Sequence, residues 1–256
     1  MPHCKSAPLH AVHKLYQYRK SLSTKPFAAR GKKLVRCPQC LLGQQFCTCN
    51  LRQYLNSNVS FMLIMYDDEV LKPTNSGRLI ADLIPNTHAF LWNRTQPDEN
   101  MLALIADEKY QPYIVFPEQY QEAGQEVVTQ VNANGDSAKT PLFILLDGSW
   151  REAIKMYRKS SYLHNIPMLS FSPELLATYA LRKGSHEFQL ATAEVASLVL
   201  TAANEPLNAV ALNKWFDLFV ESSLLGRNRR AKETLLPISD FQEAYLHAVK
   251  AAKQAN

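Results

Sequence analysis

The amino-acid sequence predicts an α/β protein built on a mainly parallel sheet. Five short apolar runs lack the alternation of a half-exposed strand, and this is typical of strands buried on both faces. Segments with helical periodicity separate and follow these runs, as the crossovers of a parallel sheet require. The runs are residues 61–66, 89–92, 113–116, 142–146 and 167–171.

Helices are expected where apolar residues recur with the 3.6-residue period. In one such segment this period places Trp150 and Tyr157 on one face and Lys155 on another. The ranges expected to be helical are residues 9–22, 76–83, 98–108, 150–159, 192–203 and 207–225.

The composition fits a soluble protein with a substantial core. Apolar residues make up 46% of the 256 positions and charged residues 20%. No apolar stretch reaches the roughly 18 residues that cross a bilayer. The first residues, MPHCK, lack the apolar centre of a secretory signal. We therefore expect a cytoplasmic location.

Basic residues are concentrated at the N-terminal end. Ten of the 28 Lys and Arg residues precede Asp67, which is the first acid in the chain. A cationic arm of this kind suits a polyanion, because each neutralised phosphate releases counterions. A lysine-rich tail that only aids solubility is the alternative. The aromatic residues Tyr16, Tyr18 and Phe27 in the arm favour binding over mere solubility.

Four of the five cysteines lie within thirteen residues, as Cys37, Cys40, Cys47 and Cys49. Disulfides are disfavoured in the cytosol, so two close pairs of thiols predict a tetrahedral metal site with zinc as the ion. Buried free cysteines, a redox pair and an iron–sulfur centre are the alternatives. Cys4 has no assigned partner.

Polar side chains follow several predicted strands, at the edge where open α/β sheets bind ligands. After the first strand the chain runs through acids into a turn that contains Asn75, Ser76, Gly77 and Arg78. The third strand runs into a Phe-Pro turn at residues 116–117. For Asn75 a plain helix cap is the alternative role.

Asp147 ends a strongly apolar strand and is followed by Gly148 and Ser149. An acid beside a low-dielectric core can have its pKa raised from about 3.9, as a general base at neutral pH requires. An ordinary helix cap is again the alternative. A further helix start lies at Thr192 and Glu194, where unpaired backbone N–H groups favour a carboxylate.

These segments, taken in order, resemble the DTW-domain family. Asp147-Gly148-Ser149-Trp150 is similar to the Asp-x-Thr/Ser-Trp motif of that family, although many members carry Thr where this chain has Ser149. The other matching segments are the cysteine pairs, Lys72-Pro73-Thr74-Asn75-Ser76-Gly77-Arg78-Leu79, Phe116-Pro117 and Thr192-Ala193-Glu194-Val195-Ala196. The resemblance covers about residues 25–230 and is strongest to the bacterial tRNA-uridine aminocarboxypropyltransferases.

The resemblance implies a SPOUT-like fold with a trefoil knot in the C-terminal part of the sheet. It also implies S-adenosylmethionine as the donor and tRNA as the partner. The reaction would transfer the 3-amino-3-carboxypropyl group to N3 of a uridine in the variable loop and release methylthioadenosine. The expected segments are a basic arm with the cysteine knuckle (1–56), a catalytic domain (57–235) and a C-terminal helical tail (236–256). The sequence does not choose between a monomer and a homodimer.

Asp147 is expected to accept or orient the N3 proton, with Ser149 and Trp150 beside it. Trp150 either packs the helix against the sheet or flanks the target base. The residues expected to bind the donor are Asn75, Ser76, Gly77, Arg78, Phe116, Pro117, Leu146, Thr192 and Glu194. Those expected to contact RNA phosphates are Lys32, Lys33, Arg36, Arg151, Lys155, Arg158, Arg227, Arg229 and Arg230. An ordinary solvated helix face is the alternative for residues 151–158.

Two other functions remain open. A SPOUT-type RNA methyltransferase would use the same donor, and a zinc-knuckle RNA-binding protein would bind tRNA without consuming S-adenosylmethionine. The acid at a buried strand end favours an enzyme, because binding alone does not need an acid there.

Overall fold

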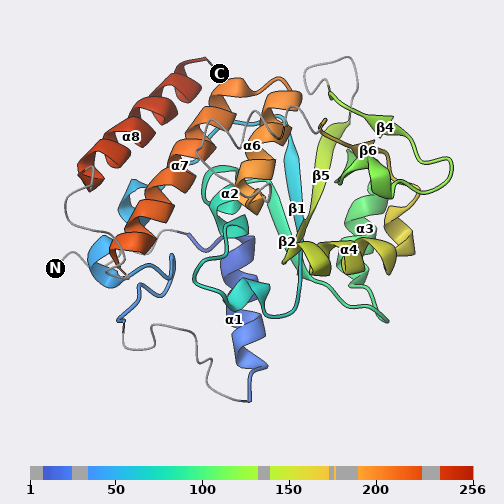
Figure 1. The fold of residues 1–256 in the computed structure, drawn as a ribbon, viewed down its shortest axis with the longest axis horizontal. Coiled ribbons are helices and arrows are strands. Elements are labelled where there is room, and N and C mark those ends of the chain that lie inside the picture. Colours follow the sequence, from blue (N-terminus) through green and yellow to red (C-terminus); the bar gives the residue numbers. More distant parts are fainter. Residues whose placement is uncertain are drawn as a thin grey trace.

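A sheet of parallel strands runs through the centre of the molecule, with helices on both of its faces (Figure 1). The computed structural model describes residues 8–24, 34–131, 139–172, 176, 190–226 and 237–255. Within these residues the sheet has six strands in the order β2-β1-β5-β3-β6-β4, and every pairing between named strands is parallel. The strands are β1 (Ser60–Met65), β2 (Thr87–Leu91), β3 (Tyr110–Val115), β4 (Val127–Val128), β5 (Thr140–Asp147) and β6 (Met168–Leu169). The predicted α/β class with a mainly parallel sheet is therefore confirmed.

The central strand β1 explains why its sequence is apolar at every position. Phe61, Leu63 and Met65 belong to the core on one face of the sheet, whereas Met62 and Ile64 belong to the core on the other. All six residues of the strand are buried. A strand covered on both faces has no position where a polar side chain reaches water, so the alternation of polar and apolar residues disappears.

The helices lie in two layers. Residues of α2, α6 and α7 join the core on one face, and residues of α3 and α4 join the core on the other. Helix α8 lies outside α7 (Figure 1). The ring of Trp215 on α7 packs against the ring of Tyr245 on α8, with centroids 4.7 Å apart. The α-helices are α1 (Ala11–Ser21), α2 (Gly77–Leu83), α3 (Glu99–Ala106), α4 (Trp150–Arg158), α6 (Thr192–Ala202), α7 (Pro206–Leu225) and α8 (Ile238–Gln254). Short 3-10 helices are η1 (Gln44–Phe46), η2 (Cys49–Leu51), η3 (Glu69–Leu71), η4 (Glu118–Tyr120) and η5 (Ser161–Leu163).

The N-terminal helix α1 lies against β2, which is the edge strand of the described sheet. Side-chain contacts with two acids fix the helix at both ends. Before its first turn, His10 Nε2 lies 3.1 Å from the Asp82 carboxylate on α2. In its last turn, the Arg19 guanidinium donates to both oxygens of Asp67, at 2.7 and 2.8 Å, just beyond β1. The helix thus connects the N-terminal part of the chain to the loop that follows β1.

One core cluster combines residues from the cysteine segment, the sheet and α8, as Leu42, Leu63 and Val249 illustrate. The division of the chain at residues 56 and 235 stays a prediction. So does the trefoil knot, because residues 177–189 and 227–236 lie outside the described residues. None of the described helices has the length and apolar character of a membrane span.

Candidate active site

Asp147 lies at the carboxyl end of β5, next to the end of β1, in the middle of the sheet. From β1 the chain crosses to β2 on one side of this point, and from β5 it crosses to β6 on the other side. Ligands of open parallel sheets bind in the crevice at such a switch point. The backbone N–H of Tyr66 donates to the Asp147 carbonyl at 2.8 Å, which holds the two strand ends together.

The carboxylate of Asp147 joins three segments that are far apart in the sequence. Asn75 Nδ2 donates to Oδ2 at 2.7 Å, and the Thr192 hydroxyl donates to Oδ1 at 2.5 Å. Asn75 precedes α2 and Thr192 begins α6, so both helices start at this acid. Ser76 adds a contact between them, since its Oγ accepts from the Ala193 backbone at 3.4 Å. The structure therefore brings together the predicted residues of the Asn-Ser-Gly turn, the β5 end and the α6 start.

Burial raises the pKa of Asp147 to about 6, because the residue is only 3% exposed and the charged form loses solvation. The hydrogen bond from Thr192 opposes this shift, the negative charge of Glu69 adds to it, and the bond from Asn75 opposes it. A pKa near neutrality lets the group exist in both protonation states under physiological conditions, as proton transfer requires.

Gly77 is the first residue of α2 and packs directly on this carboxylate. A Cβ atom at this position would lie 2.5 Å from Asp147 Oδ2 and 3.2 Å from its Cγ. Glycine is therefore required by the close approach of the helix backbone to the acid, and not by an unusual backbone angle.

Arg78 occupies a different position from the one expected of a donor-binding residue. The residue is 3% exposed, and its side chain points away from solvent. Nη2 donates to the Lys72 carbonyl at 3.0 Å, and Nη1 donates to the Cys40 carbonyl at 3.5 Å. Burial lowers the pKa of this guanidinium, and the negative charge of Asp82 acts against that shift. Arg78 thus links the cysteine cluster to the loop that carries Asn75.

Trp150 begins α4 three positions after Asp147 and is 39% exposed, so it does not pack into the core. One face of its indole stacks on Phe116, with centroids 5.6 Å apart and planes at 20°. Phe116 in turn stacks on buried Tyr157 at 4.8 Å, and Tyr120 contacts both Phe116 and Trp150 edge-on. Sequence reasoning missed Tyr120, although the aromatic residue three positions after the Phe-Pro turn was a usable signal.

Two predicted site residues, Ser149 and Glu194, take part in capping boxes at the starts of helices. Glu152 Oε2 accepts from the Ser149 backbone at 2.7 Å and from its hydroxyl at 2.6 Å, in a capping box at the start of α4. Glu194 accepts from the Ala191 backbone at 2.8 Å at the start of α6. Pro117 and Leu146 are half-buried beside the aromatic group, at the ends of β3 and β5.

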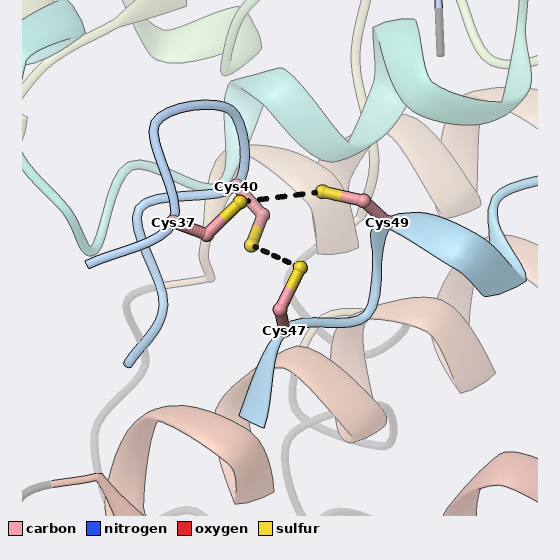
Figure 2. A group of neighbouring side chains, drawn as sticks. All are labelled: Cys37, Cys40, Cys47 and Cys49. Atoms are coloured by element: carbon pink, nitrogen blue, oxygen red, sulfur yellow. Dashed lines mark hydrogen bonds between the residues drawn. The ribbon is translucent and has the colours of Figure 1, made fainter. Parts of the chain in front are cut away.

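The four clustered cysteines can hold a metal ion. Figure 2 shows their sulfur atoms gathered between the Cys37–Cys40 turn and the Cys47–Cys49 segment. The Sγ atoms of Cys37 and Cys49 are 3.8 Å apart, as are those of Cys40 and Cys47. A tetrahedral zinc ion with Zn–S bonds of about 2.3 Å requires sulfur separations of about 3.8 Å. The cluster therefore fits zinc, and no disulfide links these cysteines.

A second group, formed by His10, His13 and Asp82, also brings possible metal ligands close together. The two imidazoles are stacked, with centroids 3.6 Å apart and planes at 19°. Because the two ring planes are nearly parallel, no ion can lie in both planes within bonding distance of a nitrogen of each ring. The two rings therefore cannot direct lone pairs at the same ion. Asp82 already accepts hydrogen bonds from Arg52 at 3.0 Å and from Trp215 at 3.1 Å. The group is better explained as a structural polar cluster that holds α1.

Some of the basic residues predicted to contact RNA have partners within the protein. Arg36 donates to the Leu41 carbonyl at 2.8 Å, inside the cysteine turn. Lys155 donates to the Tyr66 hydroxyl at 3.0 Å and lies over the rings of Tyr66 and Trp92. On α4, Arg151 and Arg158 are exposed. Lys32, Lys33, Arg227, Arg229 and Arg230 lie outside the described residues.

The model of the DTW domain matches residues 34–224, which is more than half of the chain. The chain belongs to the DTW-domain family. This family is associated with tRNA-modifying enzymes, and tRNA is the partner that it suggests. The matched range of this DTW-domain protein includes the cysteine cluster, the Asn75 turn, Asp147 and the start of α6. No solved structure shows a significant match to the chain.

Zinc should copurify with the protein and stabilise it. Replacing Cys47 by Ser removes one thiolate, so we expect loss of bound zinc and a lower melting temperature, because metal-binding free energy contributes to folding. Elemental analysis and thermal unfolding followed by circular dichroism measure both effects. Cys4→Ser is the matched control and should retain zinc. Unchanged melting after complete removal of metal would argue against a structural zinc site.

Gly77→Ala should displace either the Asp147 carboxylate or the start of α2, since the added methyl has no room. We expect destabilisation of about 1–3 kcal/mol, as is typical of overpacking in a core, measured by urea unfolding. Gly226→Ala is the control, because the nearest atom to its Cβ lies 3.4 Å away. Equal stability of the two variants would show that the acid tolerates a side chain at position 77.

Proposed function

We propose that this DTW-domain protein is an S-adenosylmethionine-dependent tRNA-uridine aminocarboxypropyltransferase. It transfers the 3-amino-3-carboxypropyl group of the donor to N3 of a uridine in the tRNA variable loop and releases methylthioadenosine. The observation that carries the proposal is the buried acid of the DTW segment, Asp147, with a pKa of about 6 at the switch point of a parallel sheet.

The reaction needs a proton acceptor beside an electrophilic carbon. The N3 atom of uridine attacks the γ-carbon of the methionine moiety, and the bond between that carbon and the sulfonium sulfur breaks. Its electron pair stays on sulfur, which leaves as the neutral thioether of methylthioadenosine. The N3 proton passes to the protein. Because all three carbons on the sulfonium are electrophilic, the site selects the product by aligning the γ-carbon, and not the methyl, with the nucleophile.

Asp147 is the group that we propose to take this proton, and Thr192 is its contact with the substrate. The carboxylate is buried, and each of its oxygens already accepts a hydrogen bond. The Thr192 hydroxyl is half-buried and donates to Oδ1, so it can accept the N3 proton while its own proton moves to Asp147. Asn75 then keeps the carboxyl group oriented from the other side.

The donor is proposed to lie against the turn of Asn75, Ser76 and Gly77. Exposed Arg151 and Arg158 on α4 are proposed to contact the RNA backbone, which is a polyanion. The four cysteines would hold a structural zinc ion, which supplies no chemical step and supports the loop of Asn75 through Arg78.

Incubating the purified protein with bulk tRNA and S-adenosylmethionine tests the proposal. Nucleoside mass spectrometry should detect a uridine that carries the aminocarboxypropyl group, together with stoichiometric methylthioadenosine. A methylated nucleoside with S-adenosylhomocysteine would instead identify an RNA methyltransferase. Binding of tRNA without consumption of the donor would identify an RNA-binding protein, and either outcome would overturn the proposal.

The proposed roles of Asp147 and Thr192 in proton transfer predict the effects of three substitutions. Asp147→Asn and Thr192→Val should each slow product formation by about 10²- to 10⁴-fold, the usual contribution of an acid or base group. Donor affinity measured by calorimetry should stay nearly unchanged in Asp147→Asn. Thr192→Ser keeps the hydroxyl and should restore most of the rate. Full activity in Asp147→Asn would refute the role of the acid.

The pH dependence of the reaction follows from the titration of Asp147. Since the carboxylate is the active form and its pKa is about 6, kcat/KM should rise as pH increases through about 6. Glu69→Gln removes a negative charge that raises the pKa of Asp147, so the rising limb should move to lower pH. A pH profile that does not respond to this substitution would assign the limb to another group.

A further inference from the structure

An open hollow lies between helix α1 and the edge strand β2, outside the site around Asp147. We propose that this hollow binds one nucleotide of the tRNA, with the base against Tyr18 and the phosphate on Lys14. The inference rests on tRNA as the partner that the DTW-domain family suggests, and not on the reaction proposed above. It adds an RNA contact that is separate from the reacting centre.

The hollow has the size and the lining of a site for a small ligand. Its volume of about 340 Å³ lies at the lower end of the range for small-ligand pockets. Helix α1, which contacts β2 (Figure 1), contributes residues three or four positions apart, and these share one face of a helix. The lining residues are Ala11, Lys14, Leu15 and Tyr18 of α1 and residues 88–90 of β2. The hollow therefore fits one nucleotide better than a helix of a partner protein.

Aromatic groups in the hollow are available for stacking on a base. Tyr18 is 57% exposed, so most of this residue is in contact with water and adds little to the core. His88 and Phe90 are half-buried on the β2 side of the hollow. The ring of His88 meets the ring of Tyr110 edge-on, with planes at 80°, which holds the imidazole in place. Bases of any sequence stack on aromatic side chains of this kind.

The charge around the hollow favours a nucleotide over an uncharged ligand. None of the lining residues is acidic, and Lys14 is exposed, with no ion pair to another residue that the structure describes. Helix α1 contains no acid and ends with Arg19 and Lys20. Burial and the positive charge of Lys109 lower the pKa of His88. The neutral imidazole has one donor and one acceptor nitrogen, which suits the edge of a base, while Lys14 suits a phosphate.

The hollow lies close enough to the reacting centre for one RNA molecule to contact both. Leu91 follows the lining residues of β2 and is in register, through β1, with Asp147. Neighbouring strands are about 4.8 Å apart, so two strand spacings separate these positions by about 10 Å. The Tyr18 end of α1 lies towards the same edge of the sheet, because Arg19 pairs with Asp67 just beyond β1. A tRNA with its uridine at the acid can therefore place another nucleotide on Tyr18.

Two substitutions separate the stacking contact from the charge contact, in fluorescence-anisotropy titrations with labelled tRNA and no donor. Tyr18→Ala should weaken binding by about tenfold, within the range for loss of one stacked base, and Tyr18→Phe should restore most of the affinity. Lys14→Ala should also weaken binding, and it should reduce the slope of log K against log salt by about 0.7–0.9, the effect of one lost phosphate contact. Tyr18→Ala should leave that slope unchanged.

Two controls test whether the hollow itself is responsible. Leu22→Ala removes an apolar side chain that is 54% exposed at the end of the same helix but does not line the hollow, so tRNA affinity should not change. Lys20→Ala removes another charge of α1 outside the lining, and it should weaken binding less than Lys14→Ala. Circular dichroism establishes that each variant is folded.

Each other outcome has a defined meaning. Wild-type affinity in Tyr18→Ala, or equal losses in Lys14→Ala and Lys20→Ala, would overturn the nucleotide site. Self-association that Tyr18→Ala abolishes, with unchanged tRNA affinity, would assign the hollow to contacts between two copies and would also overturn it. A protein that binds tRNA through the hollow but forms no aminocarboxypropyl product would refute the proposed function and leave the nucleotide site intact.

Discussion

The hydrogen bonds on the buried carboxylate of Asp147 hold the site together. Hydrogen bonds to a charged group typically contribute about 1.5–3 kcal/mol each, and they offset the loss of solvation that burial imposes. Because Asn75 and Thr192 supply these bonds from the starts of α2 and α6, the acid fixes where two helices meet the sheet. Burial raises the pKa of Asp147 and these two bonds lower it, so that the pKa is about 6. Structure and proposed chemistry therefore depend on one group.

The cysteine cluster and the site are joined through a single buried side chain. Arg78 reaches the Cys40 carbonyl on one side and the Lys72 carbonyl on the other. A zinc ion bound by four thiolates carries a net negative charge, so it would stabilise this guanidinium in a region of low dielectric. Metal binding would then support the loop that holds Asn75, although the metal lies outside the reaction. Such an ion would influence a site that it does not touch.

Local sequence patterns predicted the helices and strands. Contacts between residues far apart in the sequence became visible only in the structure. The runs that became β1 and β5 were recognisable because both faces of these strands are covered, whereas β4, with two residues, is too short to form a run. The Ser149–Glu152 spacing predicts a capping box, so the role of Ser149 was accessible from sequence alone. The bond between Asn75 and Asp147 crosses 72 positions, and no periodicity encodes it. Arg78 shows the same limit, since its motif does not reveal that the side chain points inward.

The packing of α1 on β2 has a consequence for solubility. An edge strand carries unpaired backbone N–H and C=O groups, which can pair with the edge of another molecule. In this fold the helix lies along that edge and is pinned by His10 at one end and Arg19 at the other. A chain shortened past residue 22 would leave the strand uncovered and prone to self-association. The N-terminal helix therefore covers an edge that would otherwise be free to pair with another copy of the protein.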